Sequence, residues 1–116
     1  MAATTTVGSG EYTYEVDEDW AKLPEGWEMP AAAVYGDSKD RVYCFNRDPE
    51  HPVCIFDKDG NFISSWGAGL ISFAHAIYLD KDDNVWLVDR NKHQIFKFTT
   101  EGELLMTIGE EGFRSD

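Results

Sequence analysis

Apolar and polar residues alternate along short stretches of this chain, and polar turns separate the stretches. Alternation with a period of two indicates β-strands, because successive side chains of a strand point to opposite faces of a sheet. No amphipathic helix is evident, so we expect an all-β chain with two groups of four strands after residue 30. These strands are residues 32–35, 41–45, 53–56 and 62–66 in the first group, and residues 75–79, 85–88, 95–98 and 104–108 in the second.

The second group of strands repeats the first. Residues 34–47 align with residues 77–90 at an offset of 43, and residues 59–67 align with residues 101–109 at an offset of 42. A period near 40 that is built from short strands is typical of β-propeller blades. The pattern therefore predicts two four-stranded blades in sequence, connected through Gly67-Ala68-Gly69.

One further strand is predicted before the blades. Residues 11–17 alternate between apolar and polar side chains, whereas residues 1–10 are rich in Thr, Gly and Ser and are expected to be flexible. We therefore divide the chain into a flexible N-terminus over 1–10 and a two-blade unit over 11–116. The blades are placed at about residues 31–67 and 74–109.

The composition is compatible with a packed core and restricts the partners. Hydrophobic residues make up 42% of the 116 residues and aromatic residues 14%, which suits β structure. Acidic residues number 22 against 10 basic ones, so the formal net charge is −12. Nucleic acids and anionic membrane surfaces attract positively charged proteins. We therefore expect neither nucleic acid nor a membrane among the partners.

The N-terminus guides the expected location of the protein. It lacks the basic and apolar regions of a secretory signal, and no run of the chain is long and apolar enough to span a bilayer. We expect a cytoplasmic protein. Its two cysteines, Cys44 and Cys54, are expected to be reduced and buried, because the cytosol keeps thiols reduced. A strained cross-strand disulfide is the alternative.

Several segments resemble a known family. Residues 89–98 resemble the NHL repeat, in which an Asp ends one strand and an Asn-His-Arg-Ile-like segment begins the next. Residues 73–89, followed by residues 93–97, resemble one blade of the peptidyl-hydroxyglycine amidating lyase group. Phe45-Asn46-Arg47 resembles the Phe-x-Arg segment of the preceding blade in that group. The resemblance extends over nearly all of residues 12–116.

The resemblance implies a set of site residues. Those lyases are six-bladed propellers whose channel holds a catalytic zinc, bound by three histidines from alternate blades, and a structural calcium, bound partly by backbone carbonyls. By resemblance, His75 corresponds to a zinc ligand and Arg47 to a catalytic arginine. Val34 and Ile77 correspond to carbonyl donors of the calcium.

The chain also departs from the pattern of those lyases. Ala74-His75-Ala76 stands where the family has Pro-His-Gly, and the first blade has Ala32 at the position of His75. The sequence holds no counterpart of the blades that carry the other two histidines and a catalytic tyrosine. These departures weaken the prediction of lyase activity more than the prediction of the fold.

Two blades cannot close a ring, so we expect the chain to assemble with copies of itself. An isolated pair would expose two large apolar sheet faces, which soluble monomers rarely tolerate. Three copies packed head to tail would close a six-bladed ring and would place three copies of His75 around its axis. Residues 11–17 would join a neighbouring protomer's second blade or cover a blade edge. A homotrimer is favoured; the alternatives are a truncated fragment that aggregates or dimerises, and other closures.

Two functions of different classes follow. The favoured one is a propeller building block that binds a small-molecule or peptide ligand, or a partner, at the central channel. The alternative is a metal-dependent lyase or hydrolase in which three copies of His75 hold a zinc ion that acidifies a bound water. In the plainest interpretation, His75 is a structural histidine and Arg47 pairs with Asp48 or Glu50.

Other residues are assigned to the scaffold. Asp89 and its counterpart Asn46 are expected to fix the turns that follow the second strands. His51 and His93 are expected to be structural hydrogen-bonding residues. Four aromatic residues are expected to pack between blades: Phe56, Trp66, Trp86 and Phe98.

Overall fold

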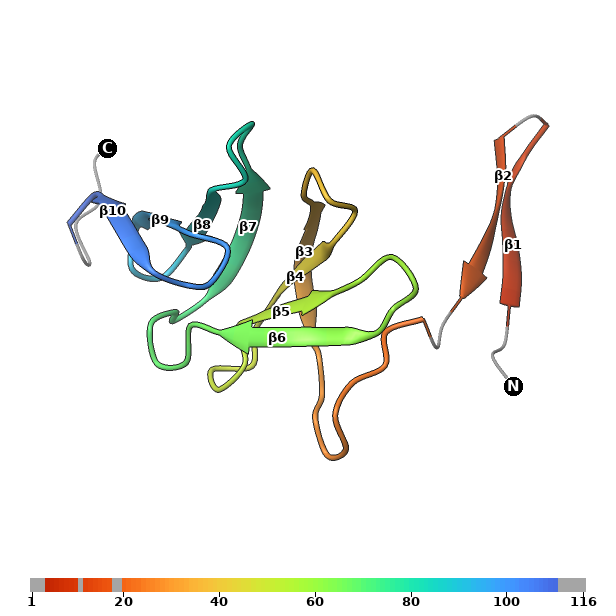
Figure 1. Cartoon of the computed structure of the whole chain (residues 1–116), viewed down its shortest axis with the longest axis horizontal. Coiled ribbons are helices and arrows are strands. Elements are labelled where there is room, and N and C mark those ends of the chain that lie inside the picture. Colours follow the sequence, from red (N-terminus) through yellow and green to blue (C-terminus); the bar gives the residue numbers. More distant parts are fainter. Residues whose placement is uncertain (1–3, 11, 18–19, 111–116) are drawn as a thin grey trace.

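The computed structural model describes residues 4–10, 12–17 and 20–110. This part of the chain is all-β: a two-stranded hairpin is followed by two four-stranded antiparallel sheets (Figure 1). We refer to β3–β6 as sheet 1 and to β7–β10 as sheet 2. The strands are β1 (Thr4–Ser9), β2 (Tyr12–Asp17), β3 (Ala31–Gly36), β4 (Val42–Asn46), β5 (Val53–Phe56), β6 (Phe62–Trp66), β7 (Ala74–Leu79), β8 (Val85–Asp89), β9 (Gln94–Phe98) and β10 (Leu104–Ile108).

Each sheet is a meander in which consecutive strands pair, in the orders β3-β4-β5-β6 and β7-β8-β9-β10. The predicted two groups of four strands are confirmed, and every predicted strand end lies within one residue of the observed one. Both sheets have the strand order of propeller blades. No helix in the described part of the chain is long and apolar enough to cross a membrane.

The N-terminal region differs from the expectation. Thr4–Ser9 forms a strand, β1, where we expected a flexible segment, and β2 pairs with β1 rather than standing alone. Threonine and valine favour extended backbone, and Gly10 has a φ of 65° in the two-residue connection between the strands. The hairpin lies at one end of the molecule and sheet 2 at the other (Figure 1).

An aspartate organises the turn between the first and second strands of each sheet. The Oδ1 atom of Asp37 accepts hydrogen bonds from the backbone N–H groups of Lys39 and Arg41, at 2.8 and 2.9 Å. The Oδ1 atom of Asp80 accepts the equivalent bonds in sheet 2, both at 3.0 Å. Each turn then passes through a residue in the left-handed region, namely Asp40 with a φ of 62° and Asp83 with a φ of 60°.

The second strand of each sheet ends on a buried polar residue that fixes the next turn. Asn46 and Asp89 are each 1% exposed. The side-chain oxygen of Asn46 accepts the N–H of Asp48 at 2.9 Å. The carboxylate of Asp89 accepts four backbone N–H groups, those of Ser72, Phe73, Asn91 and Lys92. The predicted role of these two residues is confirmed.

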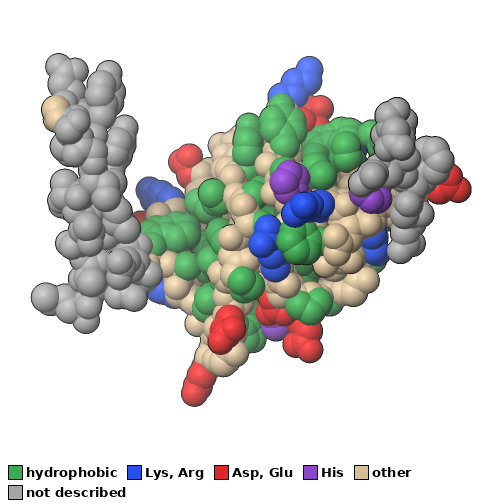
Figure 2. All heavy atoms as spheres, turned by 180° about the vertical axis from the view of Figure 1, so that it is seen from behind, with side chains coloured by type: hydrophobic (Ala, Val, Ile, Leu, Met, Phe, Trp, Pro, Cys, Tyr) green, Lys and Arg blue, Asp and Glu red, His purple; other side chains and the backbone are tan. Residues whose placement is uncertain are grey.

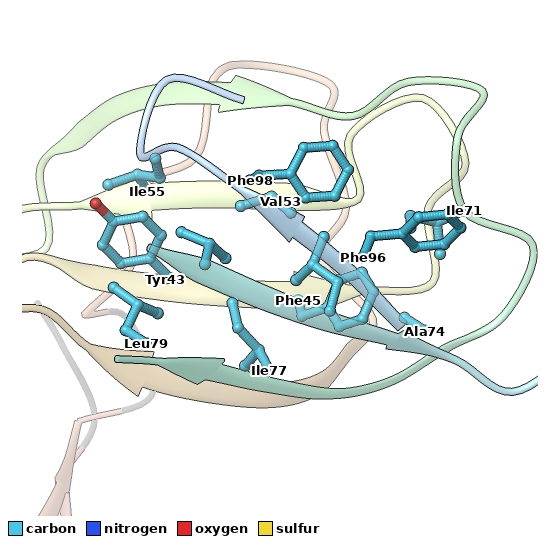
Figure 3. Packing of buried hydrophobic residues seen from close by; sticks show 12 residues of the cluster. Tyr43, Phe45, Val53, Ile55, Ile71, Ala74, Ile77, Leu79, Phe96 and Phe98 are labelled. Carbon is cyan, nitrogen blue, oxygen red and sulfur yellow. The ribbon is translucent and has the colours of Figure 1, made fainter. Parts of the chain in front are cut away.

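The main core lies between the two sheets. The face of each sheet that packs against the other is its near face, and the opposite face is its far face. Tyr43, Phe45, Val53 and Ile55 line the near face of sheet 1, and Ile77, Leu79, Val85, Leu87, Phe96 and Phe98 line that of sheet 2 (Figure 3). Trp66 and Phe98 pack between the sheets as predicted, with ring centroids 4.9 Å apart.

A connector formed by residues 20–30 covers the far face of sheet 1 over β4, β5 and β6. Trp20, Leu23, Trp27 and Met29 pack against Phe56 and the two cysteines. Phe56, predicted to pack between blades, therefore lies under the connector. By contrast, no segment of the described chain covers the far face of sheet 2, and Trp86, also predicted to pack between blades, is half-buried there.

The two cysteines are direct cross-strand partners on β4 and β5. Both are buried and unbonded. Burial raises the pKa of the Cys44 thiol to about 11, and the neighbouring Cys54 adds to this effect. The Cys44 thiol therefore behaves as a small apolar group beneath the connector. The Cys54 sulfur accepts the Asn46 side-chain N–H and donates to the His51 carbonyl oxygen, both at 3.6 Å.

Candidate functional site

The inner strands β3 and β7 lie side by side, as the inner strands of adjacent blades would. The rings of Tyr35 on β3 and Tyr78 on β7 meet edge to face, with centroids 5.3 Å apart. Both tyrosines are exposed, Tyr78 to 52%. This pair of strands carries three of the four predicted site residues: Val34, His75 and Ile77.

His75 occupies a β-bulge near the start of β7. The pairing of β7 with β8 changes register between Ala74 and Ala76, so His75 is the additional residue. Ala32 occupies the corresponding bulge of β3, where the register changes between Ala31 and Ala33. Bulges re-aim side chains, and the imidazole of His75 is exposed. The predicted equivalence of Ala32 and His75 therefore holds in the structure.

Arg47 follows β4 and reaches sheet 2 beside His75. Its Nε–H points at the carbonyl oxygen of Ala74 at 3.5 Å, and its guanidinium carbon lies 4.2 Å from the centroid of the Phe73 ring. The suggested pairing of Arg47 with a neighbouring carboxylate is not what the structure shows, because Asp48 pairs with His51 at 3.0 Å. The structure thus brings the Arg47 guanidinium to the backbone next to His75.

Val34 and Ile77 occupy equivalent positions but differ in exposure. Val34 is 60% exposed, whereas Ile77 is 7% exposed and belongs to the core between the sheets. Val34 pairs with Cys44 and Ile77 pairs with Leu87 within their own sheets. The assignment of their carbonyl groups to a calcium ion stays a prediction.

The described part of one chain does not by itself provide a zinc site. The described residues contain no group of three or more His, Cys, Asp or Glu side chains that could hold a metal ion. Zinc needs at least three protein ligands in its known site types. The imidazole of His75 is one donor, so the predicted zinc site would require His75 from further chains.

A second concave region lies between the connector and the loop after β4, and sequence reasoning did not find it. It encloses about 430 Å³ and is lined by Gly26, Trp27, Glu28, Pro30, Asp48, Glu50 and His51. Trp27 stacks on the His51 ring, with centroids 3.5 Å apart. The signal in the sequence was weak, because Trp27 and His51 lie far apart along the chain.

The electrostatics of this cleft are acidic. The backbone N–H of Glu50 and the His51 ring both lower the pKa of Asp48, so this carboxylate stays charged at neutral pH. His51 is thereby confirmed as a hydrogen-bonding residue of the scaffold. Its counterpart His93 is exposed, has a φ of 56°, and makes none of the side-chain hydrogen bonds of the described residues.

Figure 2 shows how side chains are distributed on one face of the molecule. Lysine and arginine side chains gather near a histidine in the middle of this face, among apolar side chains, and acidic side chains lie at its periphery. The overall negative charge is therefore unevenly distributed.

Known proteins are similar to parts of the chain, although no family model matches it. The peptidyl-alpha-hydroxyglycine alpha-amidating lyase 1 of Drosophila melanogaster is 38% identical over 48 residues, which are 39% of this chain and 9% of the fly protein. The probable peptidyl-alpha-hydroxyglycine alpha-amidating lyase pgal-1 of Caenorhabditis elegans is 26% identical over 72 residues, which are 58% of this chain and 21% of the worm protein. The chain thus spans a small part of these relatives, and its two four-stranded antiparallel sheets are consistent with blades of a lyase-like propeller.

Proposed function

We propose that the chain is a propeller building block: copies of it assemble into a ring, and the ring binds a ligand at a channel lined by β3 and β7. The uncovered far face of sheet 2 carries this proposal. On this face the outer strands β9 and β10 expose Ile95, Met106 and Ile108 to between 37% and 47%. Apolar surface that is contiguous in this way marks an interaction surface.

A homotrimer is the assembly we favour. Blades are stabilised by their neighbours, and head-to-tail packing of identical units gives a closed ring when the rotation per unit closes. Three two-blade units would give six blades. The molar mass of the native protein, measured by light scattering, tests the homotrimer. A mass of three chains is expected, and a monodisperse monomer would contradict the ring.

Arg47 and His75 are the residues we assign to ligand binding. Arg47 ends beside the bulge that carries His75, and the ion pairs found among the described residues join Arg41 with Asp37 and His51 with Asp48. A guanidinium group with donors to spare suits a carboxylate. The names of the relatives point to peptides whose C-terminal residue is modified glycine, so a peptide carboxylate is the ligand class we propose.

A matched pair of peptides tests this assignment. A short peptide that ends in glycine with a free carboxylate should bind roughly tenfold more tightly than its C-terminal amide, because a charge-assisted hydrogen bond contributes about 1.5–3 kcal/mol. Arg47→Gln should remove this preference, whereas Lys39→Gln, which removes one positive charge elsewhere, should keep it. Calorimetric titration measures both. Equal affinities for the two peptides would refute the carboxylate assignment.

The zinc-dependent enzyme is the second candidate. It is supported by the exposed position of His75 at a bulge of an inner strand, which three-fold symmetry would repeat around the axis. About one zinc ion per three chains, lost in His75→Ala, is the expected result of metal analysis if this candidate is right. If the protein takes up no zinc and His75→Ala does not change its metal content, the enzyme candidate is contradicted and the binding module remains.

A further inference from the structure

The connector makes the same contact with sheet 1 that sheet 1 makes with sheet 2. The indole Nε1–H of Trp66 donates to the carbonyl oxygen of Thr100 at 3.0 Å, and its ring lies against Gly102, where a Cβ would come within 2.6 Å of Trp66 Cγ. The indole Nε1–H of Trp20 donates to the carbonyl oxygen of Lys58 at 3.3 Å. Lys58 and Thr100 are repeat counterparts.

The surroundings of the two indoles match as well. A Cβ on Gly60 would lie 1.8 Å from the Trp20 carbonyl oxygen and 3.2 Å from its ring, and Gly60 is the counterpart of Gly102. Trp20 packs on Phe56 with centroids 5.7 Å apart, and Phe56 is the counterpart of Phe98. Trp20 therefore takes the place, on the far face of sheet 1, that the end of a preceding sheet would take. This far face is thus built to receive a sheet.

A second contact between the sheets involves Ser38 and Asp83. The residues at the equivalent repeat positions, Lys81 and Asp40, carry opposite charges. The N–H of Ser38 donates to the Asp83 carboxylate at 3.1 Å, and the Ser38 hydroxyl donates to the same group. In the repeat, Ser38 corresponds to Lys81 and Asp83 to Asp40. Lys81 and Asp40 are both exposed, and Asp40 has the same left-handed backbone as Asp83. A copy packed head to tail would therefore bring a lysine to an aspartate.

A third contact between the sheets joins an arginine to an alanine carbonyl, and its repeat counterparts are again an arginine and an alanine. Arg47 of sheet 1 reaches the carbonyl oxygen of Ala74 in sheet 2. Its counterpart Arg90 is exposed, and the counterpart of Ala74 is Ala31, which is also exposed at the start of β3. Arg90 of one copy can therefore reach the Ala31 carbonyl oxygen of the next.

The outer contact does not conflict with this arrangement. The counterpart of Trp66 at the end of sheet 2 is Ile108, whose side chain has no N–H to compete with Trp20 for the Lys58 carbonyl. The connector also leaves the inner strand of sheet 1 uncovered, because Val34 on β3 is 60% exposed. The connector covers Cys44 and Cys54 on β4 and β5, so the accessible part of this face is the inner strand β3 with Ala31 and Asp40 at and beyond its ends.

We infer that a second copy of this chain docks its sheet 2 on the far face of sheet 1, inside Trp20, through the pairs Lys81–Asp40 and Arg90–Ala31 carbonyl. This inference rests on the proposed ring and specifies its joint. The two charges set the order of the units, since Lys81 belongs to sheet 2, which docks, and Asp40 belongs to sheet 1, which receives it. Packing sheet 2 of one copy against sheet 2 of another would place lysine against lysine.

A double-mutant cycle on self-association tests the inference. Lys81→Glu places a carboxylate opposite Asp40, and we expect the dissociation constant of the assembly to rise about tenfold or more, as for close charge pairs across interfaces. In an Asp40→Asn background, which tolerates the left-handed turn, Lys81→Glu should have little effect. Lys58→Glu is the control, because it makes the same change of charge in the turn between β5 and β6, where Trp20 already occupies the outer part of the face. Sedimentation equilibrium measures the constants, and circular dichroism confirms folding.

The outcomes separate the joint from the ring. A wild-type protein that stays monomeric at all concentrations overturns both. A wild-type assembly that Lys81→Glu and Lys58→Glu weaken equally, or not at all, overturns this joint and leaves the ring in place. A selective effect of Lys81→Glu that disappears with Asn at position 40 supports the Lys81–Asp40 contact.

Discussion

Sheets 1 and 2 share their strand pattern and turns, but only sheet 1 has its far face covered. The cover of sheet 1 is the connector, which does not belong to the repeat and still places Trp20 on Gly60 as Trp66 is placed on Gly102. The far face of sheet 2 is apolar and uncovered by any described segment. The difference shows that a short segment with two tryptophans, Trp20 and Trp27, can bury most of such a face without a neighbouring sheet.

The two tryptophan contacts differ in tightness. Trp66 lies 4.9 Å from Phe98 with a partly buried hydrogen bond of 3.0 Å. Trp20 lies 5.7 Å from Phe56 with an exposed hydrogen bond of 3.3 Å. The connector therefore imitates the contact between the sheets with looser packing, and paired substitutions can measure the difference.

The largest effect is expected from removing the two phenylalanines. Phe98→Ala opens a cavity in the core between the sheets and should lower the free energy of unfolding by about 3–5 kcal/mol. Phe56→Ala should cost less, at the lower end of that range, because the half-buried connector can settle into the space. Urea unfolding at one fixed protein concentration, followed by circular dichroism, measures both. Equal losses would mean that the connector packs as rigidly as a sheet.

A smaller effect is expected from the indole hydrogen bonds. Trp66→Phe should cost about 1 kcal/mol of stability, the net value of a hydrogen bond, and Trp20→Phe less, because its bond is longer and exposed. Trp20→Phe should also make Cys54 react faster with a thiol reagent in the folded protein, since the connector covers that thiol. Trp66→Phe serves as the control for thiol reactivity. Faster reaction in both variants would show that the thiols report general loosening.

The smallest effect is expected from the turn aspartates, and it depends on pH. The Trp86 indole is the main cause that lowers the pKa of Asp80, with burial opposing it and the N–H groups of Asn84 and Asp82 adding to it. A lowered folded-state pKa stabilises the fold above the unfolded pKa, near 3.9, and this contribution is lost as the pH falls through the folded pKa. Asp80→Asn should therefore destabilise the protein at pH 7, and the loss should shrink as the pH falls below the unfolded pKa of about 3.9.

Asp37→Asn is the matched variant in sheet 1. Burial alone would raise the pKa of Asp37, but hydrogen bonds from Arg41, Lys39 and Tyr43 outweigh it and lower the pKa. The same pH profile is expected, and thermal unfolding at pH 7 and pH 3 measures it for both variants. A loss that is the same at the two pH values would show that the amide geometry, and not the charge, is responsible.

The strands were predictable because each carries a local signal. Alternation marks the strands, and the turn residues Asp37, Gly60, Asp80 and Gly102 mark where they end. The offset of 43 also placed Ala32 opposite His75, and the structure puts both at bulges. Signals of this kind act over a few residues, which is the range in which a sequence alone is most informative.

The features that were not predicted depend on contacts between distant segments. Trp20 meets Lys58 and Gly60 across nearly 40 residues, and its distance along the chain from Trp66 differs from the repeat offset, so the repeat does not reveal it. The pairing of β1 with β2 and the cleft between Trp27 and His51 likewise have no periodic signal. Arg47 was predicted as a site residue by resemblance, but its reach to the Ala74 carbonyl required the fold.

The equivalence of the Trp20 and Trp66 seats bears on how chains of this kind can change in length. A glycine, an acceptor carbonyl and a phenylalanine receive a tryptophan in either place, whether it begins a connector or ends a sheet. A gene duplication that adds or removes one whole sheet between these seats would need no new contact chemistry. Growth by whole units is therefore open to this architecture, while insertion of part of a unit would leave a glycine without its tryptophan.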